Sequence, residues 1–381
     1  GLNENFSFST PLLYDMIRCR LKKSGDSMIG ERIDRLRQFL QEHTADGVII
    51  MQPENLRYFS GFTGGEGALV VTGTTAVLWT DSRYTEQAAG QSGTWYAIGN
   101  HQGRLAECIA RSLYEGGAQA VVYESNFLTH MMFEQIAQQT ECDFEGYNLN
   151  VLRAVKEPFE LTATRKASAI ADQAFADLLP YIKPGVTEKE LAARLESNML
   201  LAGSEEKSFT TIVASGVRSS MPHGTASPKV IEKGDFITFD FGAVWEGYHS
   251  DITRTVVVGK ASRDQRDFYN MILAAQKEGV AAVRAGVSRK DVDFVVRNYF
   301  AARHVSQYFT HSLGHGTGLE IHEEPVLSPR STGVLKENMI VTVEPGLYIE
   351  GKYGVRIEDS VAVTADGCEI LTKTPKDLME L

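Results

Sequence analysis

The sequence has no long hydrophobic run, few cysteines and no excess of positive charge. No apolar run in its 381 residues approaches the roughly 18–20 residues that cross a bilayer. Lys and Arg number 38 against 49 Asp and Glu, and a net charge of −11 argues against binding to phosphate backbones. The four cysteines, which are Cys19, Cys108, Cys142 and Cys368, form no CxxC pair. We therefore expect no membrane or nucleic-acid partner, no disulfide framework and a reducing, cytoplasmic location.

Two common site motifs are also missing. Gly64-Gly65-Glu66-Gly67 lacks the spacing of a phosphate-binding loop and no lysine follows it, which favours a plain turn. His311 and His315 are four residues apart, but Ser312 stands where the helical zinc-protease motif has glutamate. The composition, 43% hydrophobic and 23% charged, is that of a soluble globular enzyme.

The amino-terminal part of the chain alternates helical and extended patterns. Residues 1–27 lack the pattern of a secretory signal, and we regard them as an extension of uncertain role. Beyond them apolar residues at helical spacing predict a helix that begins just after Met28. The predicted strands cover residues 47–51, 68–71, 76–79 and 120–123, and the predicted helices cover residues 84–89 and 105–114. This alternation predicts an α/β domain over residues 28–152.

Residues 153–381 contain one pattern twice. The segment Pro184-Gly-Val-Thr187 returns 101 residues later as Ala285-Gly-Val-Ser288, and both segments end on a predicted helix N-cap. Glu190 gives the first copy the spacing of a capping box. Residues 231–242 resemble residues 335–346, 104 residues later. Two matches in the same order predict two half-domains that face each other.

The duplication places acids at equivalent positions. Asp240 aligns with Glu344 at the end of an apolar strand, and Asp251 and Glu358 follow them by 11 and 14 residues. Because side chains alternate across a strand, the acids are expected on the polar faces, with Arg356 beside Glu358. Four carboxylates in one cleft cannot stay ionised together without cations. We therefore expect two divalent metal ions, and oxygen-rich ligation with one imidazole favours Mn²⁺, Co²⁺ or Fe²⁺.

Histidines cluster in residues 311–322, where dense glycines disfavour a helix. Such a segment permits an open strand or loop in which His315 reaches a metal ion. His322 suits a hydrogen-bond donor or an acid/base at the reacting carbonyl. His223 lies in the corresponding loop of the first half, and His311 is either a packed residue or a substrate contact.

These residues resemble the aminopeptidase P and proline dipeptidase family of pita-bread dinuclear metallopeptidases. The resemblance rests on four ordered segments, which are Phe239-Asp-Phe-Gly…Asp251-Ile-Thr-Arg-Thr, Gly314-His-Gly-Thr-Gly-Leu, Val343-Glu-Pro-Gly-Leu-Tyr and Val355-Arg-Ile-Glu-Asp. It implies an α+β protein in which residues 153–381 form a pita-bread catalytic domain, with two pseudo-symmetric halves and a curved antiparallel sheet covered by helices. Thr80-Asp-Ser-Arg-Tyr84 extends the likeness, less specifically, to a creatinase/prolidase-like amino-terminal domain.

The resemblance also implies roles for single residues. The implied metal ligands are Asp240, Asp251, His315, Glu344 and Glu358, and all five are present. His223, His322 and Arg356 are implied in contacts with the substrate or transition state. We add Glu344 as the base for the nucleophile and His311 as a candidate substrate contact.

The expected reaction is metal-dependent hydrolysis of the Xaa-Pro bond, at the amino terminus of peptides or in dipeptides, by a metal-bridging hydroxide. The expected cofactors are two Mn²⁺ ions, with Co²⁺, Fe²⁺ or Zn²⁺ as alternatives, and the partners are proline-containing peptides and a second copy in a homodimer. Alternatives are a methionine-aminopeptidase-like or broader aminopeptidase, although methionine aminopeptidases usually carry Met in place of Gly346. A metal-free creatinase-like amidinohydrolase and an inactive binding or chaperone homologue both conflict with five intact ligands. The choice between dipeptidase and aminopeptidase stays open.

Overall fold

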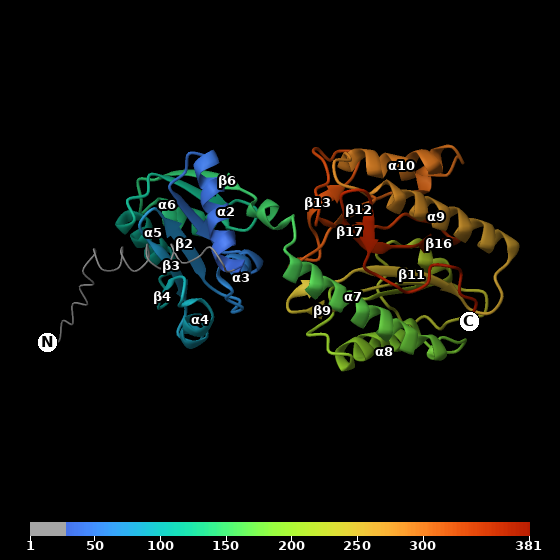
Figure 1. Cartoon of the computed structure of the whole chain (residues 1–381). Coiled ribbons are helices and arrows are strands. Elements are labelled where there is room, and N and C mark those ends of the chain that lie inside the picture. The colour runs from blue at the N-terminus through green and yellow to red at the C-terminus, as the bar shows by residue number, and fades with distance from the viewer. Residues whose placement is uncertain (1–27) are drawn as a thin grey trace. The chain divides into compact units, whose positions relative to one another are not determined.

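The computed structural model describes residues 28–381 and divides the chain into two compact units, before and after the Leu152–Arg153 bond. Each unit has its own sheets and helices (Figure 1). The extension expected over residues 1–27 lies outside the described residues. Across residues 28–381, no helix combines the length and apolar character that crossing a membrane requires.

The first unit is built on a six-stranded mixed sheet in the order β4-β3-β2-β1-β5-β6. Its strands are β1 (Gly47–Ile50), β2 (Ala68–Thr72), β3 (Ala76–Thr80), β4 (Ala97–Asn100), β5 (Ala120–Glu124) and β6 (Asp143–Tyr147). Its helices are α2 (Met28–Glu42), α3 (Pro53–Ser60), α4 (Thr85–Ser92), α5 (Leu105–Glu115) and α6 (His130–Ala137). All elements predicted for this part of the chain are confirmed. The structure adds α3, α6, β4 and β6, and β6 is a polar edge strand with little apolar signal.

The second unit repeats one order of elements, two helices followed by strands. The first half contains α7 (Pro158–Leu178), α8 (Glu188–Leu201), β7 (Ile212–Ser215), β8 (Phe236–Phe241), β9 (Val244–Trp245), β10 (Tyr248–His249) and β11 (Ile252–Val257). The second half contains α9 (Arg263–Ala282), α10 (Arg289–Ala301), β12 (Gly314–Gly316), β13 (Glu323–Leu327), β14 (Ile340–Val343), β15 (Gly346–Ile349), β16 (Tyr353–Arg356), β17 (Asp359–Val363) and β18 (Cys368–Ile370). Short 3₁₀ turns complete the chain at Leu149–Arg153, Leu179–Tyr181, Gly216–Ser220 and Ser306–Tyr308.

Each half of this unit is built on an antiparallel sheet. The strand order is β11-β8-β7 in the first half and β13-β12-β14-β17-β18 in the second. The duplication extends to backbone hydrogen bonds. Gly185 N donates to Ile231 O at 3.0 Å, and Gly286 N donates to Leu335 O at 2.9 Å. The capping box of Thr187 at α8 is present, whereas Ser288 is the N-cap of α10 without a side-chain cap bond.

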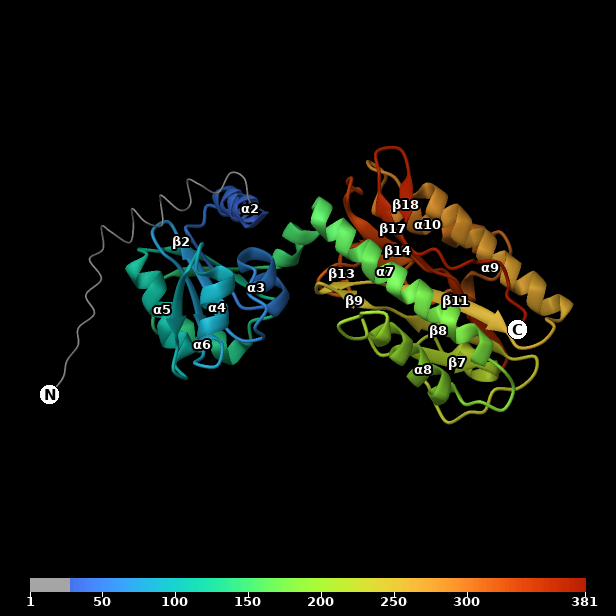
Figure 2. The ribbon, with the colours of Figure 1, turned by 60° about the horizontal axis from the view of Figure 1, so that its bottom comes forward.

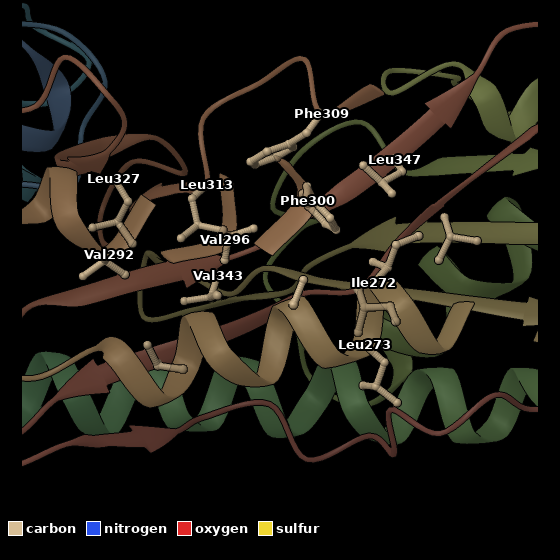
Figure 3. Packing of buried hydrophobic residues seen from close by; sticks show 14 of the residues in the cluster. Ile272, Leu273, Val292, Val296, Phe300, Phe309, Leu313, Leu327, Val343 and Leu347 are labelled. Carbon is tan, nitrogen blue, oxygen red and sulfur yellow. The ribbon is translucent and has the colours of Figure 1, made fainter. Parts of the chain in front are cut away.

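Each half has an apolar core between its helices and one face of its strands. Ile237, Phe239 and Phe241 of β8 pack with residues of α7 and α8, which lie along these strands in Figure 2. Figure 3 shows the other core, where Val296 of α10 lies close to Val343 of β14. Because apolar side chains occupy this face of the strands, the alternate polar side chains emerge on the opposite face, as predicted from the sequence.

Candidate active site and metal centre

All nine residues that sequence analysis selected line one cavity of about 560 Å³ in the second unit. They are His223, Asp240, Asp251, His311, His315, His322, Glu344, Arg356 and Glu358. The fold gathers side chains that are up to 135 positions apart in the chain, and contributions come from both halves. This convergence of acids and imidazoles makes the cavity the candidate active site.

The four acids lie at equivalent ends of strands. Asp240 is next to last in β8, and Glu344 directly follows β14. Asp251 and Glu358 each stand one residue before a strand, β11 and β17 respectively. Three of the acids thus flank strands and only Asp240 lies within one, and the duplicated topology still brings all four to the same cavity.

His315 stands at the centre of the acidic group. Its Nε2 lies 3.4 Å from Glu344 Oε1 and 3.5 Å from Asp251 Oδ2. Ligand atoms of Asp251, His315 and Glu358 all lie within 4.8 Å of one another. The backbone of β12 can approach β14 only because Gly314 has no side chain, since a Cβ there would be 1.9 Å from Thr342 O. An open strand or loop was expected in this glycine-rich segment, and the structure has a short strand there.

Asp251 and Glu358 are buried, Asp240 and Glu344 are partly buried, and the group is under electrostatic strain. Burial raises the pKa of Asp251 well above its usual range, and the charge of Glu358 adds to this effect. Burial likewise raises the pKa of Glu358, with repulsion from Glu344, and it raises the pKa of Glu344 itself to about 7. Cations between these carboxylates would remove the strain.

Carboxylate oxygens without a hydrogen-bond partner are also available to bind such cations. Asp240 Oδ1, Asp251 Oδ1 and Glu358 Oε1 are buried and have no hydrogen-bond partner within residues 28–381. Burial lowers the pKa of His315, so its ring is neutral at neutral pH and can act as a ligand. Carboxylate oxygens with one imidazole form a donor set that fits divalent ions such as Mn²⁺.

Arg356 lies beside this cluster and is 4% exposed. Its guanidinium contacts Asp240 Oδ2 at 2.5 Å and donates to the Tyr348 hydroxyl at 2.8 Å. It also donates to Thr253 Oγ1 at 3.1 Å. Arg356 is therefore a fixed positive charge at the wall of the cavity, not a mobile surface residue.

The remaining histidines face the cavity in different states of burial. His311 Nε2 lies 3.1 Å from the Tyr348 hydroxyl, and burial with the charge of Arg356 lowers the pKa of His311 to about 4. The ring of His322 packs against that of His315 with centroids 4.3 Å apart. Burial lowers the pKa of His322, so its imidazole is neutral and has one N–H to donate at neutral pH. His223 lines the cavity from the loop after the 3₁₀ turn at Gly216–Ser220.

Sequence analysis missed three residues that orient these groups. Tyr348 joins His311 to Arg356, and Thr253 donates to Glu358 Oε2 at 2.7 Å. Thr342 Oγ1 accepts the backbone N–H of His315 at 3.0 Å and donates to Glu344 at 3.1 Å. A signal for Tyr348 was available, because it ends one of the four segments that carried the resemblance.

Apolar side chains complete the lining of the cavity and are called the apolar wall below. Phe209, Ile212, Pro222, Ile321 and Val326 contribute to it. The cavity therefore offers apolar surface and charged groups to the same small ligand.

A duplicated fold around buried carboxylates and an imidazole is the architecture of a metal-dependent hydrolase. Residues 162–365 match the model of metallopeptidase family M24, and residues 32–155 match the creatinase/prolidase N-terminal domain. The chain belongs to metallopeptidase family M24, with a creatinase/prolidase-type α/β domain before a pita-bread catalytic domain. Membership of the family implies a dinuclear metal site and peptide substrates.

Similar proteins cover nearly the whole chain. The Xaa-Pro dipeptidase of Pyrococcus furiosus is 38% identical over 353 residues, which are 92% of this chain and 99% of that protein. The structure of an Xaa-Pro dipeptidase from Bacillus anthracis superposes with a TM-score of 0.89 at 42% identity, covering 93% of this chain and all of that one. An X-Pro aminopeptidase from Thermotoga maritima has a TM-score of 0.81 at 38% identity, covering 89% and 98%.

Proposed function

We propose that this protein hydrolyses the peptide bond between an amino-terminal residue and proline. The observation that carries the proposal is that the acids, His315 and the apolar wall all line one cavity. The acidic side attracts the free amino group of a substrate, and the apolar side suits a proline ring. Relatives named Xaa-Pro peptidases support the same substrate class.

The proposed metal ligands are Asp240, Asp251, His315, Glu344 and Glu358. Divalent ions held there would supply Lewis acidity toward the scissile carbonyl and would lower the pKa of water. We propose Mn²⁺ as the first choice, since most of the donors are carboxylate oxygens, with Co²⁺, Fe²⁺ and Zn²⁺ as alternatives.

Protein side chains carry the proton transfers and stabilise developing charge. Glu344 accepts a proton from the attacking water and passes it to the proline nitrogen as the C–N bond breaks. His322 and His223 donate hydrogen bonds to the carbonyl oxygen as negative charge develops on it. Arg356 holds Asp240 and Tyr348 in place at the cavity wall, and neutral His311 extends this network.

The proposed substrate explains one requirement of the site. A proline at the scissile bond has no N–H, so the site needs no hydrogen-bond acceptor at that atom. The side chains of the apolar wall, which include Phe209 and Val326, offer no such acceptor.

Overall similarity does not distinguish an aminopeptidase from a dipeptidase. The dipeptidase from Pyrococcus furiosus and the aminopeptidase from Thermotoga maritima are both 38% identical to this chain. The distinction depends on how much space lies beyond the proline. The choice must therefore be made with substrates of different length.

The test is to strip metal from the protein and assay it with and without Mn²⁺ on Ala-Pro and Ala-Pro-Ala. Cleavage of the dipeptide alone indicates a dipeptidase, and cleavage of the tripeptide indicates an aminopeptidase. An Asp251→Asn variant is the matched control, because it should lose Mn²⁺-dependent activity on both. Mn²⁺-dependent cleavage of Met-Ala alone would replace the proposal by a methionine-aminopeptidase-like activity, and no cleavage by any metal would favour a binding protein.

Two further expectations belong to the same proposal. We propose a homodimer, which analytical ultracentrifugation of the metal-loaded protein would detect. We also propose a cytoplasmic location, which fits the thiols of Cys108, Cys142 and Cys368, all free in the described part of the chain. Fractionation of the source cells would test it.

A further inference from the structure

A group of two acids and two basic residues, three of them buried, includes the residues on either side of Ile321 and His322, which line the cavity, and none of the four has been considered so far. Arg153 and Lys156 come from the beginning of the second unit, and Glu320 and Glu323 come from the segment around His322. The side chains of Arg153, Lys156 and Glu323 are at most 1% exposed. Lys156 Nζ lies 2.5 Å from Glu323 Oε1, and Arg153 Nη2 lies 3.1 Å from Glu323 Oε2 and 2.5 Å from Glu320 Oε2.

Glu323 is the point on which this group converges, and it directly follows His322 in the chain. Its backbone pairs with Gly316, the residue after His315. The turn between the two histidines therefore begins and ends beside Glu323. A displacement of the Glu323 side chain would move the backbone that carries His322.

The turn itself is closed around the Glu323 carboxylate. Gly318 lies so close that a Cβ there would be 2.3 Å from Glu323 Oε1. The backbone N–H of Glu320 points to Glu323 Oε2 at 3.4 Å. The carboxylate thus fills the space that a side chain at residue 318 would need, and the turn depends on where the carboxylate lies.

The charges explain what holds the carboxylate there. Removing one partner of a buried ion pair leaves an uncompensated charge, which is strongly unfavourable. Two positive and two negative side chains balance in this group. Without Lys156 the Glu323 carboxylate would have a lower free energy if it turned toward water. The segment that carries His322 would then move with it.

We infer that Arg153 and Lys156 are positioning residues for His322 and act through the Glu323 carboxylate. The inference rests on the proposed function, in which His322 donates a hydrogen bond to the oxygen of the transition state. Such a donor contributes only when it is accurately placed. Loss of the placement therefore lowers kcat more than it raises KM.

The first experiment compares Lys156→Met with the wild-type protein at saturating Mn²⁺ on the Xaa-Pro peptide that the wild type cleaves. We expect kcat to fall about 10- to 100-fold, with KM changing less than about threefold. Arg165→Met is the matched control, because Arg165 pairs with Glu369 on the surface of the same unit at 2.7 Å. The control should keep the wild-type kcat.

Two further variants separate positioning from folding. Lys156→Met combined with Glu323→Gln removes one charge of each sign, and this double variant should regain part of the kcat lost by the single variant. Gly318→Ala leaves every charge in place but displaces the same carboxylate, so it should show the same fall in kcat. A purely structural role predicts a lower melting temperature with an unchanged kcat per folded molecule.

A measurement that needs no enzymatic activity tests the position of His322 independently of the proposed reaction. The imidazole Cε1–H resonance of His322, assigned with a His322→Gln variant, is recorded by NMR in the metal-free protein. It should shift in Lys156→Met and Gly318→Ala and stay in place in Arg165→Met. Unchanged resonances and an unchanged kcat would overturn the inference, whereas shifted resonances in a protein that cleaves no Xaa-Pro peptide would overturn only the proposed function.

Discussion

Glu188 and Arg289 are the first residues of equivalent helices, α8 and α10, and they carry opposite charges. Each pairs with an opposite charge near a loop that bears a proposed catalytic histidine. Glu188 contacts Arg218 in the 3₁₀ turn before the loop of His223, and Arg289 Nη1 lies 2.8 Å from Glu324 Oε2, two residues after His322. In each half the first residue of this helix therefore forms an ion pair, and the sign of its charge is reversed between the halves.

The two pairs differ in burial, and this difference yields the first prediction. The Glu188 side chain is fully buried and accepts bonds from the backbone and hydroxyl groups of Ser215 and Ser227, at 2.7 to 2.9 Å. Glu188→Ala should lower the free energy of unfolding by about 3 kcal/mol, because it leaves those donors and Arg218 without their partner. Arg289→Ala should cost about 1 kcal/mol or less, because its pair is partly exposed.

Urea unfolding of both variants measures the difference. Glu190→Gln, in the same turn of α8, is the control and should leave the free energy of unfolding nearly unchanged, since glutamine can also complete the exposed capping box. Equal losses for Glu188→Ala and Arg289→Ala would show that burial does not distinguish the pairs.

A second prediction concerns acid stability. Burial lowers the pKa of His311 from 6.5 to about 4. Between these values the unfolded chain binds a proton that the folded protein does not, so the free energy of unfolding falls as the pH falls from 6.5 to about 4. His311→Gln should remove this dependence, which is worth up to about 3 kcal/mol.

The measurement is the difference in unfolding free energy between the wild type and His311→Gln at pH 7 and pH 4.5, both metal-free. The difference is needed because the pKa of Glu344 is raised to about 7, which acts in the opposite direction. Parallel pH curves for the two proteins would mean that the folded protein protonates His311 as readily as the unfolded chain does.

The sequence was sufficient for the parts of the site that follow a periodic pattern. The duplication aligned Asp240 with Glu344, and the alternation of strand residues assigned the acids to the polar face. Both depend on local geometry, namely two-residue alternation and the repeat of an entire supersecondary unit. The open strand or loop expected at His315 followed in the same way from the conformational demands of its glycines.

Contacts between distant segments could not be predicted in this way. Arg153 and Glu323 are separated by 170 positions, and neither residue shows any periodicity that would pair them. Ser288 was predicted as an N-cap and is one, but its side chain makes no cap bond. The polar edge strand β6 was missed because its sequence, Asp143–Tyr147, has no apolar alternation to report.

A third prediction concerns the protons that metal binding displaces. The pKa values of Asp251, Glu344 and Glu358 are raised in the metal-free protein, so these carboxyl groups retain protons at pH values where ordinary acids have lost them. Binding of Mn²⁺ must release those protons, and its affinity should rise with pH. Calorimetric titration at pH 6 in buffers of different ionisation enthalpy gives the number released.

The matched control for this titration is Asp172→Asn, which changes an acid of α7 outside the cavity and should release the same number of protons as the wild type. Glu358→Gln should release fewer protons and bind Mn²⁺ more weakly. Binding without any proton release at pH 6 would contradict the raised pKa values.

The last prediction tests the apolar wall as the site of the proline ring. Phe209 is half-buried and lines the cavity, so its ring offers contact area to an apolar substrate group. Phe209→Ala should lower kcat/KM for Ala-Pro about tenfold, since an apolar contact of this kind is worth about 1–3 kcal/mol. The loss for Ala-Ala should be smaller because alanine has fewer carbons to bury. Phe127→Ala, which removes an exposed ring of the first unit, should leave both values unchanged. An equal loss on both dipeptides would place the proline elsewhere in the cavity, because only a residue in contact with the ring can distinguish it from alanine.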